Sequence, residues 1–428
     1  MSGFFISIPV MDFEIAIKKR KCYKEDEEED DQPLNRLSCL PHDIALDILS
    51  RLPIKSVIQF RFSCRSWNFL SRDLQLVDMH MSRALICQRL CLIFHSDYPI
   101  RNQLHFVEFS DVDDNEIVRK IDTPFAVSMP EFNVIGSCNG LLCLIDSLFS
   151  DSIYIYNPFT RDYKLLPKFV EFENQIVIFG FGFHPITKRY KVIKIVYYPS
   201  VYNLEIPRHV RRFTHMSSRR SDVQIYNLGT DKWRSIGQAP YRLEKRSSLG
   251  VLVSGKLHWM SHWGKYNGRR NRIIVSFDLS DDSFQEIPGP NTGNLRSLMN
   301  CHVAVLGGCL CAVLPSYGGN GGHDIWVMKE YGVKESWVKE FTLGVYSPRF
   351  IRPDMQKSYQ IWRKFLGGRL VRIVCLLKSG DILVEYRGGT LVSYNPDSGM
   401  FKNIAFQGMP KMFQTIVHIG SLYPVVQS

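Results

Sequence analysis

The sequence contains little that would place the protein in a membrane or a secretory compartment. Beyond the short apolar stretch Gly3–Val10 it has no long apolar run, so a membrane span is not expected. That stretch precedes the first basic residues, whereas a signal peptide begins with basic residues. No Asn-x-Ser/Thr acceptor occurs, and the 11 cysteines, an odd number, are scattered without a paired framework. These absences indicate a reducing compartment, and we expect the protein in the cytoplasm, the nucleus or both.

The sequence also lacks the patterns that catalysis usually requires. It has no Gly-rich phosphate loop that ends in Lys-Ser/Thr, and no nucleophile elbow. His258 and His262 are four residues apart, but Gly255–Trp259 has the pattern of a strand, so the two imidazoles would not share a helix face as a metal pair does. Cys309 and Cys311 would share one side of a strand, where buried packing is favoured over metal ligation. We expect no catalytic residue, cofactor or metal site.

The net charge of +11 is unevenly distributed along the chain. Glu25–Asp31 is an unbroken acidic run of seven residues, so the remainder of the chain carries +18. Together with the basic run Lys18–Lys21, it predicts a disordered, charged tail over residues 1–36. The basic run is either a nuclear-localisation signal or a solvated basic cluster, and both interpretations remain open.

The densest helical pattern lies in Leu40–Leu70. Apolar residues recur there at helical spacing, and a first helix would begin near Pro41 and end before Pro53. A second amphipathic run follows, and Ser63 is suited to cap a third. Three short helices have too little interior to be stable alone. They should bury their apolar faces against a partner or against the rest of the chain.

This stretch contains the motifs Leu40-Pro41, Ile48-Leu49-x-x-Leu52-Pro53 and Arg61-Phe62-x-Cys64-Arg65-x-Trp67. In these residues its sequence resembles the F-box, a helical motif that docks on a Skp-type adaptor within a Skp–cullin–F-box ubiquitin ligase. The chain departs from the family pattern at Asp43, where glutamate is frequent, and at Phe62-Ser63, where Cys-Val is common. An ordinary helical cap on a larger domain is the alternative.

The resemblance implies an F-box over residues 37–83 and a role for two sets of side chains. The residues implied to contact the adaptor are Leu40, Pro41, Ile44, Ile48, Leu52 and Pro53. The residues implied to hold the helices together are Val57, Phe60 and Trp67.

After Arg83 the helical spacing gives way to short β-rich runs, in which one pattern recurs. An aromatic residue is followed by Asn or Asp, and a second aromatic residue lies seven positions after the first. The four pairs are Tyr156 with Tyr163, Tyr226 with Trp233, Phe277 with Phe284, and Tyr394 with Phe401. Each pair predicts a β-hairpin whose turn is held by the Asn or Asp side chain. Trp326 and Trp337 resemble a fifth copy with four extra residues.

Each copy follows a second unit, in which apolar residues flank a turn of glycine and small residues, so each repeat predicts about four strands. The first aromatic residues lie about 60 positions apart on average, which is typical of propeller blades. Leu85–Phe94 and Leu104–Phe109 are expected to form another blade, which Phe413–Leu422 would complete. The predicted fold is a short three-helix F-box followed, over residues 84–428, by a β-propeller of about six four-stranded blades.

This combination, together with the Gly-Phe-Gly-Phe-His-Pro segment at Gly180–Pro185, is similar to plant F-box proteins with a C-terminal, kelch-like F-box-associated β-propeller. The resemblance spans nearly the whole chain. It implies a non-catalytic substrate receptor, which binds a Skp-type adaptor and through it cullin, and recruits a protein for ubiquitination. One alternative is a basic propeller scaffold that binds nucleic acid or acidic proteins without ligase function. An enzyme built on the propeller is another.

The long connections of the propeller should converge on one face, because successive turns of a meander alternate between its two faces. Long loops on one face of a repeat array often form its binding surface. The residues expected on a target-binding face are Arg211, Arg212, Arg219, Arg220, Trp263, Arg269, Arg270 and Arg272. Arginine pairs well with acidic or phosphorylated groups, so we expect a target of that chemistry. Solvated loop charge is the alternative.

Overall fold

A computed structural model describes the chain between residues 40 and 425. Within that span it leaves out residues 64, 88–89, 110–115, 149–151, 169–174, 199–220, 231, 245–249, 262–263, 267–268, 293–300, 317–321, 347–370 and 387–388. The predicted tail over residues 1–36 lies outside the described residues. From Leu46 onward the chain forms one compact unit.

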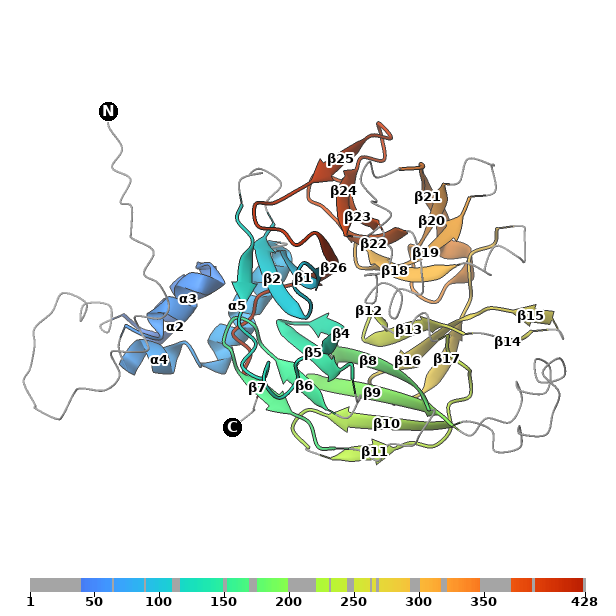
Figure 1. The fold of residues 1–428 in the computed structure, drawn as a ribbon. Helices are drawn as coiled ribbons and strands as arrows, with labels where there is room; N and C mark the ends of the chain where they lie inside the picture. The colour runs from blue at the N-terminus through green and yellow to red at the C-terminus, as the bar shows by residue number, and fades with distance from the viewer. Residues whose placement is uncertain are drawn as a thin grey trace, which may run out of the picture. The chain divides into compact units, whose positions relative to one another are not determined.

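Four helices occupy the first part of the described chain (Figure 1). They are α2 (His42–Arg51), α3 (Ile54–Phe60), α4 (Arg65–Leu70) and α5 (Leu74–Ile86). Pro53 has extended backbone angles and separates α2 from α3. Asp73 caps α5 by accepting a hydrogen bond from the Gln75 amide at 2.7 Å. The described part of the chain thus contains α5 in addition to the three helices expected.

Six four-stranded antiparallel sheets follow, numbered as blades 1 to 6 in chain order of their first strands. Blade 1 contains β4 (Phe132–Cys138), β5 (Leu141–Asp146), β6 (Ile153–Tyr156) and β7 (Tyr163–Leu165). Blade 2 contains β8 (Ile176–His184), β9 (Arg189–Tyr197), β10 (Ser221–Asn227) and β11 (Trp233–Ser235). Blade 3 contains β12 (Val251–Val253), β13 (Lys256–Met260), β16 (Ile274–Asp278) and β17 (Phe284–Ile287).

Blade 4 contains β18 (His302–Leu306), β19 (Cys309–Pro315), β20 (His323–Met328) and β21 (Trp337–Leu343). Blade 5 contains β22 (Val371–Leu376), β23 (Ile382–Tyr386), β24 (Thr390–Tyr394) and β25 (Phe401–Ile404). Blade 6 contains β26 (Met412–His418), β1 (Cys91–Tyr98), β2 (Gln103–Glu108) and β3 (Arg119–Ile121). A separate hairpin of β14 (Gly264–Tyr266) and β15 (Arg269–Asn271) is inserted between β13 and β16.

The blades close into a ring. The first strand of each blade contacts the first strand of the next, in the order β4, β8, β12, β18, β22, β26 and back to β4. Blade 6 combines the last strand with three early ones, because β26 pairs antiparallel with β1. The six-bladed propeller predicted from the repeats is therefore confirmed. One boundary differs: Leu85 belongs to α5, and the first strand begins only at Cys91.

The four aromatic pairs confirm the predicted hairpins. Each first aromatic residue lies directly opposite its partner across the third and fourth strands of blades 1, 2, 3 and 5. Asn157 Oδ1 accepts hydrogen bonds from the Phe159 and Thr160 amides, and Asn395 Oδ1 accepts one from the Ser398 amide. Asp278 Oδ1 accepts the Ser280 amide at 2.8 Å. The Asn or Asp side chain thus holds the turn in blades 1, 3 and 5, as expected. In blade 2 the prediction was wrong, because Asn227 Oδ1 is buried and accepts no hydrogen bond from the described residues.

The fifth aromatic pair was assigned to the wrong residue. Trp337 lies opposite Met328, whereas Trp326 lies opposite Lys339. The intervening loop brings Tyr331 to the neighbouring blade, where its hydroxyl lies 2.7 Å from His258 Nε2. The extra residues therefore serve a contact between blades 3 and 4, which hairpin spacing alone does not reveal.

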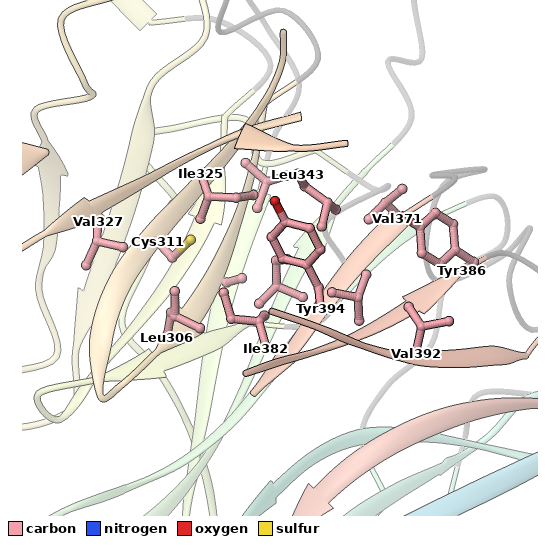
Figure 2. Close-up of a cluster of buried hydrophobic side chains, with 14 residues drawn as sticks. Leu306, Cys311, Ile325, Val327, Leu343, Val371, Ile382, Tyr386, Val392 and Tyr394 are labelled. Carbon is pink, nitrogen blue, oxygen red and sulfur yellow. The ribbon is translucent and has the colours of Figure 1, made fainter. Parts of the chain in front are cut away.

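Apolar side chains fill the spaces between neighbouring blades. Figure 2 shows one such cluster, in which Cys311 and Ile325 of blade 4 pack with Ile382 and Val392 of blade 5. Cys311 is fully buried, and burial raises the pKa of its thiol well above the usual range. This burial agrees with the packing role expected for it from the sequence.

Three buried histidines should make the fold sensitive to acid. Burial lowers the pKa of His95 and His258 to about 4 and that of His418 to about 3. Below about pH 6.5 the unfolded chain binds protons that the folded chain does not, so stability falls as the pH falls. Each histidine should remove ~1.4 kcal/mol of unfolding free energy per pH unit between about pH 6 and pH 4.5, measured by urea denaturation. The His258→Gln variant should show a shallower pH dependence, and an unchanged slope would contradict this assignment.

Candidate functional site

The propeller has two faces, which carry different connections between its strands. The turns between the third and fourth strands of every blade, and those between the first and second strands of blades 1 to 5, lie on one face, termed the turn face. The second-to-third connections and the connections between blades lie on the opposite face, termed the loop face. The strand order of the six sheets produces this separation.

The helices from Leu46 onward pack on the turn face. Leu46, Leu49 and Val57 are buried in one apolar cluster with Phe159, which comes from the turn between β6 and β7 of blade 1. The same cluster contains Leu422, from the segment that follows β26. The helices from Leu46 onward thus bury part of their apolar surface against the propeller of the same chain, which is one of the two outcomes expected for three short helices.

One side of α2 remains uncovered. Ile44 and Ile48 lie one helical turn apart and are 48% and 44% exposed, whereas Ala45 and Leu49 on the other side are buried. Two exposed isoleucines in register on a short helix form an apolar strip that none of the described residues fully covers.

The other residues predicted to contact an adaptor border this strip in the sequence. Pro41 and Pro53 are exposed, and Leu40 and Leu52 are half-buried. The first of these prolines precedes α2, and the second follows it. All six predicted contact residues therefore retain some exposure.

The residues predicted to hold the helices together have different environments. Val57 is fully buried. Phe60 and Trp67 are half-buried, and their rings stack with centroids 5.4 Å apart at an angle of 28°. Asp47 of α2 bonds to both Arg51 and Arg83, so it connects α2 with α5.

Two exposed aromatic residues of the helical segment were not predicted as site residues. Phe62, in the turn after α3, is 73% exposed, and Phe69 of α4 is 79% exposed. Both fall off the apolar stripe that Val57, Phe60 and Trp67 continue. Their position off this stripe could have predicted their exposure, because large aromatic residues outside a buried stripe face solvent or a partner.

The predicted target-binding residues lie mostly beyond what the structure describes. Arg211, Arg212, Arg219, Arg220 and Trp263 lie outside the described residues.

The remaining three lie in or after the inserted hairpin of blade 3. Arg269 and Arg270 lie on β15, whose backbone pairs with β14 in the register Tyr266↔Arg269 and Lys265↔Arg270 (Figure 1). Arg272 Nη2 donates to Glu244 Oε1 at 2.6 Å, and the two side chains are only 16% and 3% exposed. This guanidinium therefore neutralises a buried carboxylate of the same chain.

A group of exposed apolar residues on the loop face was also not predicted. Its members, on the second-to-third connections of blades 6 and 1 and on the connection between these blades, are Tyr98, Ile100, Val127 and Leu148. Glu131 joins these connections, because its carboxylate lies 3.5 Å from Arg101 Nη1 and its carbonyl accepts the Ser147 amide at 2.9 Å. This part of the loop face thus carries exposed apolar side chains, at connections other than those of the predicted target-binding arginines.

Only one member of the histidine pair considered for metal binding lies within the described chain. His258 Nδ1 lies 3.0 Å from the Val251 carbonyl, and its other nitrogen is engaged by Tyr331. His262 lies outside the described residues. In the part that the structure covers, no group of three His, Cys, Asp or Glu side chains could hold a metal ion. No helix there is long and apolar enough to cross a membrane.

Comparisons with known proteins agree with this division of the chain. A family model described as F-box domain matches residues 37–78, and one described as F-box associated beta propeller domain matches residues 89–427. The F-box protein At3g07870 of Arabidopsis thaliana is 46% identical over 396 residues, which cover 90% of this chain and 92% of the relative. The F-box/kelch-repeat protein At3g23880 of the same plant is 26% identical over 382 residues, 85% of this chain and 89% of the relative. The F-box protein CPR1 of Arabidopsis thaliana is 25% identical over 413 residues, which cover 90% of this chain and 89% of the relative.

The Arg272–Glu244 pair should contribute to stability. The Arg272→Met variant would leave the buried Glu244 carboxylate without this cation, which should cost ~3–5 kcal/mol in urea denaturation. The double variant Arg272→Met with Glu244→Leu should recover most of that loss, because it removes both charges. A single variant as stable as the wild type would show that the pair is not structural.

Proposed function

Because this chain belongs to the F-box proteins with an F-box associated β-propeller domain, we propose that it is the substrate-recognition subunit of a Skp–cullin–F-box ubiquitin ligase. In this proposal the F-box docks on a Skp-type adaptor, and through it on cullin. The propeller holds a target protein near the ubiquitin-loaded enzyme. The chain contributes proximity, and the catalytic residues belong to other subunits.

The observation that carries this proposal is the unequal burial of the two sides of α2. Leu46 and Leu49 are buried in the apolar cluster on the turn face, whereas Ile44 and Ile48 are exposed to solvent. A helix that presents an exposed apolar strip is suited to enter the groove of a partner protein. The exposed rings of Phe62 and Phe69 extend the apolar surface available on the same helical segment.

The separation of the two faces supports the second half of the proposal. The helices pack on the turn face, and the described strand ends that border the long connections lie on the opposite loop face. A target on the loop face would therefore leave the helices free for the adaptor. We propose that the target is an acidic or phosphorylated protein, because the chain outside its acidic run carries +18. We place the protein in the cytoplasm, the nucleus or both.

Replacing Ile44 and Ile48 by Asp should abolish adaptor capture. Two carboxylates in an apolar contact would have to be desolvated, so the affinity for a purified Skp-type adaptor should fall at least about tenfold, measured by titration calorimetry. The Leu40→Ala, Pro41→Ala double variant should also lose adaptor binding.

The matched control is Val127→Asp with Ile186→Asp. It adds the same two charges at exposed apolar positions of the propeller, 98% and 86% exposed, and should bind the adaptor like the wild type. Full binding by the Ile44 and Ile48 variant, or equal losses in both, would argue against docking through α2.

Charge reversal on the loop face should remove targets without affecting the adaptor. Replacing Arg211, Arg212, Arg269 and Arg270 by Glu would repel acidic or phosphorylated groups. We expect proteins that accumulate on the wild-type chain when cullin is inactive to be depleted from this variant, as measured by quantitative mass spectrometry. An unchanged set of captured proteins would disprove recognition through these arginines.

A further inference from the structure

The segment that follows β26, residues 419–425, lies between the helices and the propeller and is termed the strap. Leu422 is 2% exposed and belongs to the apolar cluster of the helices. Val425 is 1% exposed and belongs to a different cluster, which blades 1 and 2 form. Tyr423 contacts both clusters, so the strap touches the helices on one side and two blades on the other.

Asn157 attaches the strap to blade 1. Its buried side chain donates from Nδ2 to the Ser421 and Tyr423 carbonyls, at 2.9 Å each. Its Oδ1 at the same time accepts the Phe159 and Thr160 amides that shape the turn. One amide side chain therefore holds both the hairpin turn and the strap.

The same sequence motif is used differently in blade 5. Asn395 also follows a tyrosine and precedes a proline, and its Oδ1 also accepts an amide of its own turn. Its Nδ2, however, donates to Asp381 Oδ1 at 2.8 Å within the same blade. The motif can therefore hold a turn without bonds to another segment, and the bonds from Asn157 to the strap are an additional feature of blade 1.

Two glycines let the strap lie close to its neighbours. A Cβ on Gly140, in the turn between β4 and β5, would overlap the Ser421 side chain. A Cβ on Gly420 would lie 3.1 Å from side-chain carbons of both Ile54 and Phe159. No space remains between α3, the strap and blade 1 at these points.

A second attachment holds α3 on blade 6. Lys55 Nζ lies 2.8 Å from Glu108 Oε1 and 4.9 Å from the centroid of the Phe106 ring. This pair is partly exposed, so it is screened by solvent and contributes less than the buried contacts of the strap.

We propose that the strap couples α3 to the propeller as one rigid body, and that Asn157 and Leu422 are positioning residues for ubiquitin transfer. The coupling stands on the contacts above, whereas the positioning role rests on the proposed ligase function. A rigid connection between the adaptor-binding helices and the propeller sets which lysines come within reach of the ubiquitin-loaded enzyme. Loosening it should broaden that set without changing adaptor affinity.

The first test compares Asn157→Ala with Asn395→Ala by hydrogen–deuterium exchange of the full chain bound to the adaptor. Loss of the strap bonds should speed amide exchange in Ile54–Phe60 at least tenfold in Asn157→Ala and leave it unchanged in Asn395→Ala. Leu422→Ala, which removes a helix contact and keeps Asn157, should give the same acceleration. Unchanged exchange in α3 for both Asn157→Ala and Leu422→Ala would overturn the coupling.

The second test maps ubiquitin on the propeller's own lysines in a reconstituted Skp–cullin ligase, with adaptor affinity measured in parallel. Wild type and Asn395→Ala should share a restricted set of modified lysines, and Asn157→Ala and Leu422→Ala should modify additional ones at equal adaptor affinity. The same set in all four proteins would overturn the positioning role. If no lysine is modified even in the wild type, both the positioning role and the proposed ligase function would be overturned. The coupling of α3 to the propeller would then still be tested by the exchange measurement.

Discussion

The propeller depends on the pairing of its last strand with its first. β26 pairs with β1 from Cys91↔His418 to Tyr98↔Met412, and this pairing gives blade 6 its first strand. Arg372 of β22 donates both to Glu385 of β23 and to the Thr415 carbonyl of β26, while the Thr415 amide donates to Glu385 at 3.0 Å. Burial raises the pKa of the Glu385 carboxyl, and the Arg372 guanidinium opposes that shift. Blade 5 thus bonds to the closing strand through Arg372 and Glu385, whose bonds to Thr415 form only when the ring is closed.

The register of that closure also determines where the functional surfaces lie. Because Cys91 pairs with His418, the chain enters β1 and leaves β26 at the same end of blade 6. α5 precedes β1 and the strap follows β26, so both are brought to the turn face. Closure of the ring therefore brings the helices, the strap and blade 1 together, and leaves the long connections on the other face.

The candidate site could be predicted only in part from the sequence. The helical spacing of Ile44, Ile48, Leu49 and Leu52 indicated one apolar face, but it could not say which of these residues would be buried against the propeller. Arg272 was grouped with the loop arginines by its type, but it pairs with the buried Glu244, which lies 28 positions away. The exposed apolar residues Tyr98, Ile100, Val127 and Leu148 come from three connections and share no pattern along the chain.

The sequence by itself determined the features that depend on neighbouring residues. Each aromatic pair, its Asn or Asp turn and the four-strand repeat are encoded within a few positions, because a hairpin closes over a short loop. Where two local patterns are the same, only the tertiary structure decided which partner the side chain bonds to. Asn157 and Asn395 lie in the same motif, yet Asn157 bonds to Ser421, 264 positions away, whereas Asn395 bonds within its own blade. The partner of a polar side chain across such a distance depends on how the ring closes, and local spacing carries no information about that closure.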